Sequence, residues 1–304
     1  MSLPVDPSVC VVIPARDAAG TLGAQLAALS MQRGAPPFRV IVVDNGSVDD
    51  TAAIASGFDS PTMPVAVVHE AVAGINHARN AGVRTASEIV LLCDADDEVS
   101  EGWVETLVTA LVPGTWVAGP LDFRRLNSER TRALWGGRDQ SPMSGPVPFR
   151  DSGNGSNCGF FREMWTEIGE FDPSVVGHGD ESEFFARAWA GGYQLQWAPS
   201  AVVNYRQRSS ARAMLRRRFR QGRSQVRIAT RPEWPEGAPI PSLSGALRSV
   251  LGGARMILMA AVGRRAEWPG AAAIALNLGR LWQLCCTRIG HSRSAPRTRR
   301  RPTG

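Results

Sequence analysis

A short apolar run that ends in a cluster of acids constrains this sequence more than any other segment. Residues 89–93 are all apolar, and Asp94, Asp96, Asp97 and Glu98 follow within five positions. A run without polar positions is typical of a strand buried on both faces of a parallel sheet. Its acids would then lie at the carboxyl end of the strand, where open α/β sheets bind their ligands. Because clustered carboxylates repel one another unless a cation neutralises them, we predict a divalent metal, and oxygen ligands on a short loop favour Mg²⁺ or Mn²⁺.

The same acids allow a second interpretation as a helix cap. Asp97 or Ser100 would be the N-terminal cap of a helix over residues 101–111, since short oxygen-bearing side chains are favoured at that position. The residues of this loop alone leave the choice between a metal site and a capped helix open.

Strands and helices alternate through the first part of the chain. Apolar, β-rich runs lie at residues 9–13, 38–43, 65–68 and 88–93. Helical patterns lie between them at residues 21–29, 51–54 and 75–83. Alternation at this spacing implies βαβ units and a mainly parallel sheet with helices on both faces. We therefore predict an open α/β fold of the Rossmann-like kind.

The second part of the chain is less regular and more basic. After a strand at 115–121, residues 124–148 are rich in Gly, Pro, Ser and Arg and are predicted to form a long loop. Shorter elements are expected at 155–162, 163–168, 181–189, 194–197 and 201–203. A basic helix follows from residue 209, and then two apolar helices at 243–262 and 271–289. The net charge of +6 is concentrated here, which points to an anionic partner, either lipid headgroups or nucleic acid.

Acids, not glycines, follow the predicted strands. Residues 13–20 contain neither GxGxxG nor GxxxxGK, which argues against dinucleotide and P-loop sites. Instead Asp17, Asp44 and the pair Asp94 and Asp96 each follow a strand. Such carboxylates can accept hydrogen bonds from a base or a ribose, while a neighbouring one holds a metal. Together they predict a nucleotide site, although each could also stabilise a turn.

Four ordered motifs resemble the signatures of family 2 glycosyltransferases. They are VVIPARD at 11–17, VVDNGSVDDT at 42–51, ARNAG at 78–82 and LCDADD at 92–97. The resemblance covers approximately residues 9–205. It implies a GT-A fold, a nucleotide-sugar donor, a divalent metal, and transfer with inversion at the anomeric carbon.

The resemblance also implies roles for single residues. It assigns the following to the nucleotide-sugar: Pro14, Ala15, Asp17, Asp44, Asn45, Ser47, Arg79, Asp94 and Ala95. Within this set Asp44 would contact the base, Asp17 the base or ribose, and Asp94 the ribose. Asp96 would bind the metal.

Inverting transfer requires a base that takes the proton of the acceptor hydroxyl. Residues 155–162, 168–172 and 179–184 resemble the family's acceptor side, which ends in an acidic pair that opens a helix. Asp180 and Glu181 are therefore the candidates, and counting back from Arg187 favours Glu181. Both acids would also complement the dipole of that helix.

Further candidates surround the acceptor. Asn157 and His178 are expected on the acceptor side, and Trp135 could stack on a sugar. The family often has a His after the last strand, but residues 201–206 contain none. Arg206 or Arg208 could contact the diphosphate instead.

These motifs divide the chain into three parts. We expect a GT-A catalytic domain at 1–208, with a donor half at about 1–121 and an acceptor half at about 122–208. A basic, amphipathic helical extension follows at 209–290, and a disordered Arg-rich tail at 291–304. The extension either contacts a membrane peripherally or packs on the catalytic domain. Nucleic acid is the less favoured partner, because no nucleic-acid module is recognisable.

Function and location follow as expectations. The acceptor is expected to be a saccharide or a lipid-linked hydroxyl compound in cell-envelope polysaccharide, glycolipid or related synthesis. The alternative is a non-catalytic nucleotide-sugar-binding or scaffolding relative. Five cysteines without CxxC spacing suggest buried free thiols in a reducing compartment. With no signal peptide and no long apolar span, we expect a cytoplasmic protein, held at the inner face of the cell membrane if the extension binds lipid.

Overall fold

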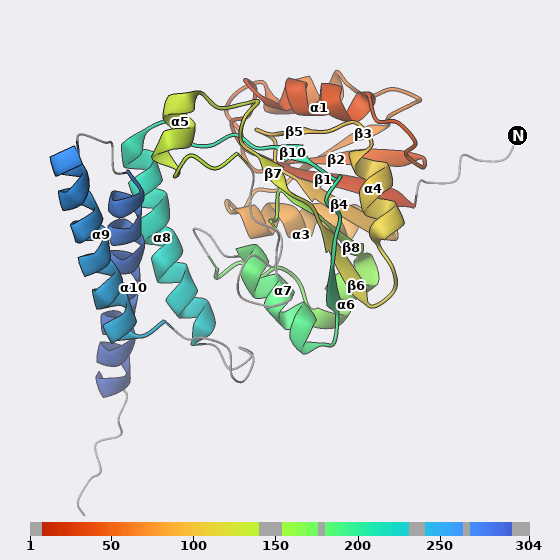
Figure 1. The fold of residues 1–304 in the computed structure, drawn as a ribbon. Helices are drawn as coiled ribbons and strands as arrows, with labels where there is room; N and C mark the ends of the chain where they lie inside the picture. Colours follow the sequence, from red (N-terminus) through yellow and green to blue (C-terminus); the bar gives the residue numbers. More distant parts are fainter. Residues whose placement is uncertain (1–7, 140–153, 176–179, 231–240, 264–267, 294–304) are drawn as a thin grey trace, which may run out of the picture.

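A computed structural model describes residues 8–139, 154–175, 180–230, 241–263 and 268–293 of the chain. His178 and residues 294–304 of the basic tail lie outside this described part. Figure 1 shows a sheet-containing part and, beside it, three long helices. These three helices are α8 (Ala211–Ala229), α9 (Leu243–Gly263) and α10 (Trp268–Arg293).

The central sheet confirms the predicted α/β architecture. Its strand order is β3-β2-β1-β4-β8-β6-β9. The strands are β1 (Val9–Ala15), β2 (Phe38–Asp44), β3 (Val65–His69), β4 (Ile89–Cys93), β6 (Thr115–Ala118), β8 (Asn157–Phe161) and β9 (Gln194–Trp197). Strands β1, β2, β3 and β4 pair in parallel, whereas β8 pairs antiparallel with both β4 and β6. The sheet is therefore mainly parallel, as predicted.

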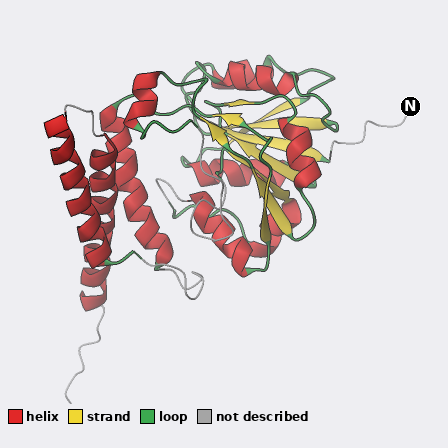
Figure 2. Cartoon of the chain, viewed as in Figure 1, coloured by secondary structure: helices red, strands yellow, loops and turns green. Residues whose placement is uncertain are grey.

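Helices cover both faces of this sheet (Figure 2). They are α1 (Leu22–Ser30), α2 (Thr51–Ser56), α3 (Ile75–Thr85), α4 (Trp103–Ala110), α6 (Arg162–Ile168) and α7 (Asp180–Ala190). Val11 and Ile13 of β1 belong to a core shared with α1 and α4. Cys10 and Val12 belong to a second core with α3, α6 and α7. Alternate residues of one strand thus enter opposite cores, which explains why β1 is apolar at nearly every position.

A small second sheet brings distant segments together beside the acidic loop. Its order is β5-β10-β7, with β5 at Glu98–Val99, β7 at Leu121–Asp122 and β10 at Val203–Asn204. The single strand expected at 115–121 is therefore wrong, because the chain leaves the main sheet after β6. At this break a Cβ on Gly119 would lie 2.1 Å from the carbonyl oxygen of Ala201. Glycine therefore allows the two backbones to approach closely.

Two further sequence predictions need correction. The loop expected at 124–148 contains a helix, α5 (Glu129–Leu134), which Ser128 caps by accepting a hydrogen bond from the backbone N–H of Thr131. The helix after the acids is α4, whose N-cap is the left-handed Gly102 with no side-chain capping bond. The interpretation of Asp97 or Ser100 as its cap is therefore wrong.

The cysteines divide into two groups. Cys10, Cys93 and Cys158 are buried and free, as expected. Cys285 and Cys286 are also free but exposed on α10, so the prediction of buried thiols is wrong for this pair.

Close backbone packing joins α10 to α8. A Cβ on Gly279 would lie 2.0 Å from the carbonyl oxygen of Phe219, and one on Gly222 would lie 1.8 Å from that of Leu276. Real Cβ atoms do not come this close to a backbone oxygen, so a side chain at either glycine would force the two helices apart.

We expect Gly279→Ala to destabilise this helix pair by about 1–3 kcal/mol, the usual cost of overpacking a tight contact. Urea unfolding and hydrogen exchange of the α8 and α10 amides would measure the effect. Gly252→Ala in α9 is the matched control, since a Cβ there meets no atom within 4 Å. That control should gain up to about 1 kcal/mol from its higher helix propensity. Equal stability of both variants would contradict the close packing.

Among the helices of the described part, none combines the length and the apolar character required to cross a bilayer.

Candidate active site

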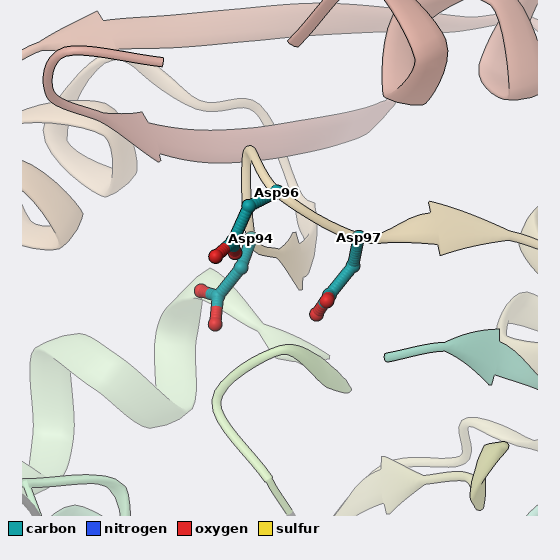
Figure 3. Close-up of side chains that lie close together, drawn as sticks. All are labelled: Asp94, Asp96 and Asp97. Carbon is teal, nitrogen blue, oxygen red and sulfur yellow. The ribbon is translucent and has the colours of Figure 1, made fainter. Parts of the chain in front are cut away.

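The acids that follow β4 form a compact group. Asp94 and Asp96 are half-buried, Asp97 is buried, and one carboxylate oxygen from each lies within 4.8 Å of the others. Figure 3 shows the three side chains leaving the loop on the same side. Because β4 lies in the middle of the sheet, the group is fixed by the strand that precedes it.

Hydrogen bonds from two distant segments hold this loop. The side-chain amide of Gln25, on α1, donates to the carbonyl oxygen of Asp94 at 3.1 Å and accepts from the N–H of Val99 at 2.9 Å. Arg206 donates its backbone N–H to Oδ1 of Asp97 at 2.7 Å and its Nε–H to the carbonyl of Asp96 at 2.9 Å. The loop is therefore braced from both sides before any ligand binds.

Asp97 is the electrostatically strained member of the group. Burial, and then the charges of Asp94 and Asp96, raise the pKa of its carboxyl well above the usual value. Its Oδ2 atom is buried and has no hydrogen-bond partner within the described part of the chain. A cation among these oxygens would relieve both the repulsion and the unsatisfied atom. The residues present therefore fit a divalent metal with oxygen ligands, although the family resemblance assigns only Asp96 to it.

A second cluster lies at the ends of β1 and β2. Ala15 and Asp44 are paired neighbours in the parallel register. Ser47 links the cluster, since its backbone N–H donates to Oδ1 of Asp44 and its hydroxyl accepts from the N–H of Asp17, both at 3.0 Å. Asp17 has a left-handed backbone (φ 48°), and its carboxylate accepts a hydrogen bond from the N–H of Val48 at 2.9 Å. The structure thus brings Asp17, Asp44 and Ser47 together on the sheet edge that also carries the acidic loop.

The carboxylate of Asp44 is ionised and can accept hydrogen bonds. Burial acts to raise the pKa of its carboxyl, but hydrogen bonds from Ser47 and the contact with His69 outweigh burial and lower it below the usual value. The group is therefore charged at neutral pH. Pro14, Ala15 and Ala95 are buried at the same edge.

Asn45 has a structural role in the loop after β3. Its amide donates to the carbonyls of Glu70 and Val72 at 2.9 and 2.7 Å. Its oxygen accepts from the N–H of Gly74 at 2.7 Å, and the residue is 6% exposed. The amide and the oxygen are therefore both engaged within the protein, and contact with the nucleotide-sugar stays a prediction.

Asn157 likewise has a structural role. Its side chain is fully buried, and its amide donates to the carbonyls of Pro120 and Ala201 at 2.9 and 2.8 Å. Its oxygen accepts from the indole N–H of Trp103 at 2.8 Å. Asn157 therefore joins β8 to the segments before β7 and β10, and its place on the acceptor side stays a prediction.

A cavity of about 800 Å³ opens in front of the acidic loop. Asp94, Asp96, Arg79 and Glu181 line it, and helices α8 and α10 close one side. Seven arginines contribute to its walls: Arg79, Arg138, Arg206, Arg208, Arg217, Arg218 and Arg220. The structure thus brings Glu181, in the first turn of α7, to the same cavity as the acids after β4. The side chain of Asp180 is not described.

Arg79 is positioned by close packing. It is 4% exposed on α3, and its guanidinium carbon lies 5.5 Å from the ring centre of Phe171. A Cβ on Gly155 would lie 2.3 Å from Nη2 of Arg79, so a larger residue there would displace the guanidinium. Arg79, the arginine of the third motif, therefore lines the cavity from α3.

Trp135 was expected to stack on a sugar. It lines the cavity, but two arginine side chains lie against its ring. The guanidinium carbons of Arg217 and Arg218 lie 5.4 and 5.2 Å from its ring centre, and its indole N–H donates to the carbonyl of Arg208 at 3.0 Å. The indole therefore organises cations from α8, a role that the sequence did not indicate.

The sequence did not single out several residues that line or support the site. Gln25 lies on the apolar face of a helix, where a polar residue between leucines is the available signal. Asp97 was predicted as part of the acidic cluster or as a helix cap, but not by itself as a metal ligand. Arg217 and Arg218 were treated as surface charges, since nothing local in α8 shows which arginines face the cavity.

Comparison with known proteins shows what the chain is similar to. Residues 10–154 match the family model described as glycosyl transferase family 2. This part of the chain is therefore similar to family 2 glycosyltransferases. A glycosyltransferase of Haloferax volcanii, AglE, is 25% identical over 228 residues, which cover 73% of this chain and 74% of that relative. The uncharacterised glycosyltransferase YibD of Escherichia coli K12 is 38% identical over 71 residues, 23% of this chain and 21% of that protein. The chain is accordingly a transferase enzyme.

Solved structures of glycosyltransferases share the GT-A fold. The mannosyltransferase PcManGT of Pyrobaculum calidifontis, in complex with GDP-Man and Mn²⁺, has a TM-score of 0.64 at 21% identity and covers 92% of this chain and 88% of its own. Glucosyl-3-phosphoglycerate synthase of Mycobacterium tuberculosis has a TM-score of 0.53 at 19% identity and covers 76% and 82%. These likenesses confirm that the chain has the GT-A fold.

Proposed function

We propose that this chain is an inverting, metal-dependent glycosyltransferase that moves a sugar from a nucleotide diphosphate to a hydroxyl acceptor. The observation that carries the proposal is that Asp94, Asp96 and Glu181 line one cavity at the ligand-binding edge of the sheet. A metal-binding group and a base on one cavity are what a single displacement requires.

The metal would be held by Asp94, Asp96 and Asp97. Their oxygen-only donor set suits Mg²⁺ or Mn²⁺, and the complex of PcManGT contains Mn²⁺. Such an ion supplies neutralisation of the negative charge that develops on the departing diphosphate. Arg206 and Arg208 line the same cavity and would add to that neutralisation.

The nucleotide would lie over the ends of β1 and β2. The ionised Asp44 can accept the N–H of a uracil, guanine or thymine base, with Asp17 and Ser47 beside the ribose. Asp94 would accept a ribose hydroxyl, and Arg79 would lie beside the phosphates. Support comes from the hydrogen-bonded cluster of Asp17, Asp44 and Ser47.

Glu181 would be the base that takes the proton of the acceptor hydroxyl as the bond to the sugar forms. Its place on the cavity wall supports this role, and counting back from Arg187 favours it over Asp180. His178 stays a candidate on the acceptor side.

The helical extension is proposed to hold the enzyme at the inner face of the cell membrane, where polysaccharide, glycolipid or related acceptors are made. Large apolar side chains are exposed on α9 and α10: Leu247, Leu251, Met256, Ile257, Leu278 and Trp282. Apolar residues beside a basic helix favour a lipid interface. In this proposal residues 1–208 are the catalytic domain and 209–290 the extension.

A thermal-shift screen of nucleoside diphosphates with Mn²⁺ tests the donor assignment. We expect one of the uridine, guanosine or thymidine diphosphates to raise the melting temperature, because a ligand that binds the folded state stabilises it. Slow hydrolysis of the matching nucleotide-sugar should follow. Binding without hydrolysis or transfer would favour the scaffolding alternative, and absence of any metal-dependent binding would refute the proposal.

A further inference from the structure

We propose that Arg138, Arg217 and Arg218 form a subsite for a phosphate group on the acceptor. This inference rests on the proposed function and names the class of acceptor, a phosphorylated hydroxyl compound. Arg217 and Arg218 come from α8 and Arg138 from the segment after α5, and all three line the cavity that contains Glu181.

The two arginines of α8 are held in place before any ligand binds. Nη1 of Arg217 donates to the hydroxyl of Tyr205 at 2.8 Å, and its guanidinium carbon lies 5.8 Å from the centre of that ring. Arg218 donates to the side chain of Gln221 at 3.1 Å, and both guanidinium groups lie against Trp135. Pre-ordered guanidinium groups lose little conformational entropy when they bind an anion.

No direct ion pair within the described part of the chain neutralises the charge of this cluster. Within the described part of the chain, no carboxylate lies within ion-pair distance of Arg138, Arg217 or Arg218. Nε of Arg218 is buried without a hydrogen-bond partner there. Burial, and then the charges of Arg217 and Arg138, lower the pKa of Arg218. Three positive charges in a partly buried position repel one another, and a bound anion would relieve this repulsion. Guanidinium groups favour phosphate as that anion.

The subsite adjoins the proposed reaction centre. Burial acts to lower the pKa of Arg217, but Tyr205 and then Glu181 and Asp94 outweigh it and raise the pKa above the usual value. Arg217 therefore lies within electrostatic reach of the proposed base. A phosphate bound to it would hold the acceptor hydroxyl close to Glu181.

Two features assign this cluster to the acceptor and not to the donor. The donor already has its own cationic partners, the metal site and Arg206, which is bonded to the acidic loop. In addition, α10 gives the cavity an apolar wall at Ala272, Ala273 and Leu276. Guanidinium groups facing small apolar side chains suit a phosphate monoester with a nonpolar portion. Lipid phosphates and soluble phosphate esters share that chemistry.

The test uses the full chain saturated with Mn²⁺ and the nucleoside diphosphate that binds it. Calorimetry would compare glucose 6-phosphate with the uncharged methyl glucoside, and co-sedimentation would compare phosphatidylcholine vesicles with and without phosphatidic acid. We expect at least one phosphate probe to bind, with the uncharged counterpart at least about tenfold weaker. Binding of the soluble ester or of the anionic vesicles identifies the source of the phosphate. Binding of neither overturns the inference.

The double variant Arg217→Ala, Arg218→Ala should weaken that phosphate binding at least about 30-fold, since each charged hydrogen bond is worth several-fold or more. Its affinity for the nucleoside diphosphate should stay within about twofold of wild type. The matched control is Arg212→Ala, Arg216→Ala, which removes the same charge from exposed positions of α8 outside this cavity. It should retain phosphate binding.

A second variant that keeps the charge controls for an effect of the alanine substitutions on folding. Arg217→Lys, Arg218→Lys preserves two cations but not the planar fork, so phosphate binding should fall about tenfold with the melting temperature little changed. Loss of nucleotide binding in either α8 variant would move the cluster to the donor and overturn the inference. Failure of nucleotide binding in the wild-type protein would instead refute the proposed function.

Discussion

Replacing Asp96 with asparagine should abolish metal-dependent donor binding. Asparagine keeps the shape of the side chain but removes one of three negative charges whose oxygens lie within 4.8 Å. A divalent ion then loses a charged ligand, and we expect donor affinity in Mn²⁺ to fall at least about 100-fold, more than is usual for residues that only support a ligand. Calorimetry with the nucleoside diphosphate, with and without Mn²⁺, would measure this loss.

The loss should not result from unfolding. The charge of Asp96 helps to raise the pKa of the buried Asp97, so its removal reduces repulsion within the loop. We therefore expect the metal-free variant to melt at the wild-type temperature or above. Asp50→Asn is a matched control, since Asp50 is exposed at the start of α2 and makes no side-chain capping bond. Unaltered metal-dependent binding in Asp96→Asn would exclude this acidic group as the metal site.

The sequence was informative about the fold wherever local pattern and burial agree. The run at 89–93 predicted a doubly buried strand because every position is apolar, and β4 lies between β1 and β8. The direction of β8 was not predictable in this way. Apart from Asn157, its residues are apolar, as in a buried parallel strand. Its antiparallel pairing depends on where the chain returns to the sheet.

The candidate site was predictable where a side chain follows its own strand. Asp44 and Asp96 were placed correctly at the sheet edge, because strand ends converge there. Asn45 follows the same strand, but its amide turns to carbonyls 25 and 27 residues ahead. Its partners are backbone atoms, which no sequence motif identifies.

Long-range contacts account for the remaining misses. Gln25 and Arg206 brace the acidic loop across separations of 69 and 109 residues. Arg217 and Arg218 reach the cavity because α8 packs beside the catalytic part. A periodic basic helix does not specify which face is turned inward, so the sequence left membrane contact and packing on the catalytic domain as alternatives and did not show which arginines line the cavity.

Replacing Glu181 with glutamine should spare donor binding and nearly eliminate turnover. Glutamine fills the same space on the cavity wall but cannot accept the acceptor proton. Loss of a general base typically lowers the rate by about 10²–10⁴-fold. Metal-dependent hydrolysis of the nucleotide-sugar provides the readout, since water needs the same proton transfer as an acceptor. Calorimetry should show the donor affinity within about twofold of wild type, because the metal group and the cluster at Asp44 are untouched.

The adjacent acid, Asp180, provides a control for this prediction. Asp180→Asn is the matched control, because it removes the same charge from the same helical turn. If Glu181 is the base, Asp180→Asn keeps most of the activity, and Glu181→Asp restores part of it by returning a carboxylate on a shorter side chain. Wild-type turnover in Glu181→Gln together with loss in Asp180→Asn would transfer the role to Asp180. Equal losses in both variants would instead indicate that the charge at the start of α7 matters more than either proton acceptor, since both acids favour the positive end of the helix dipole.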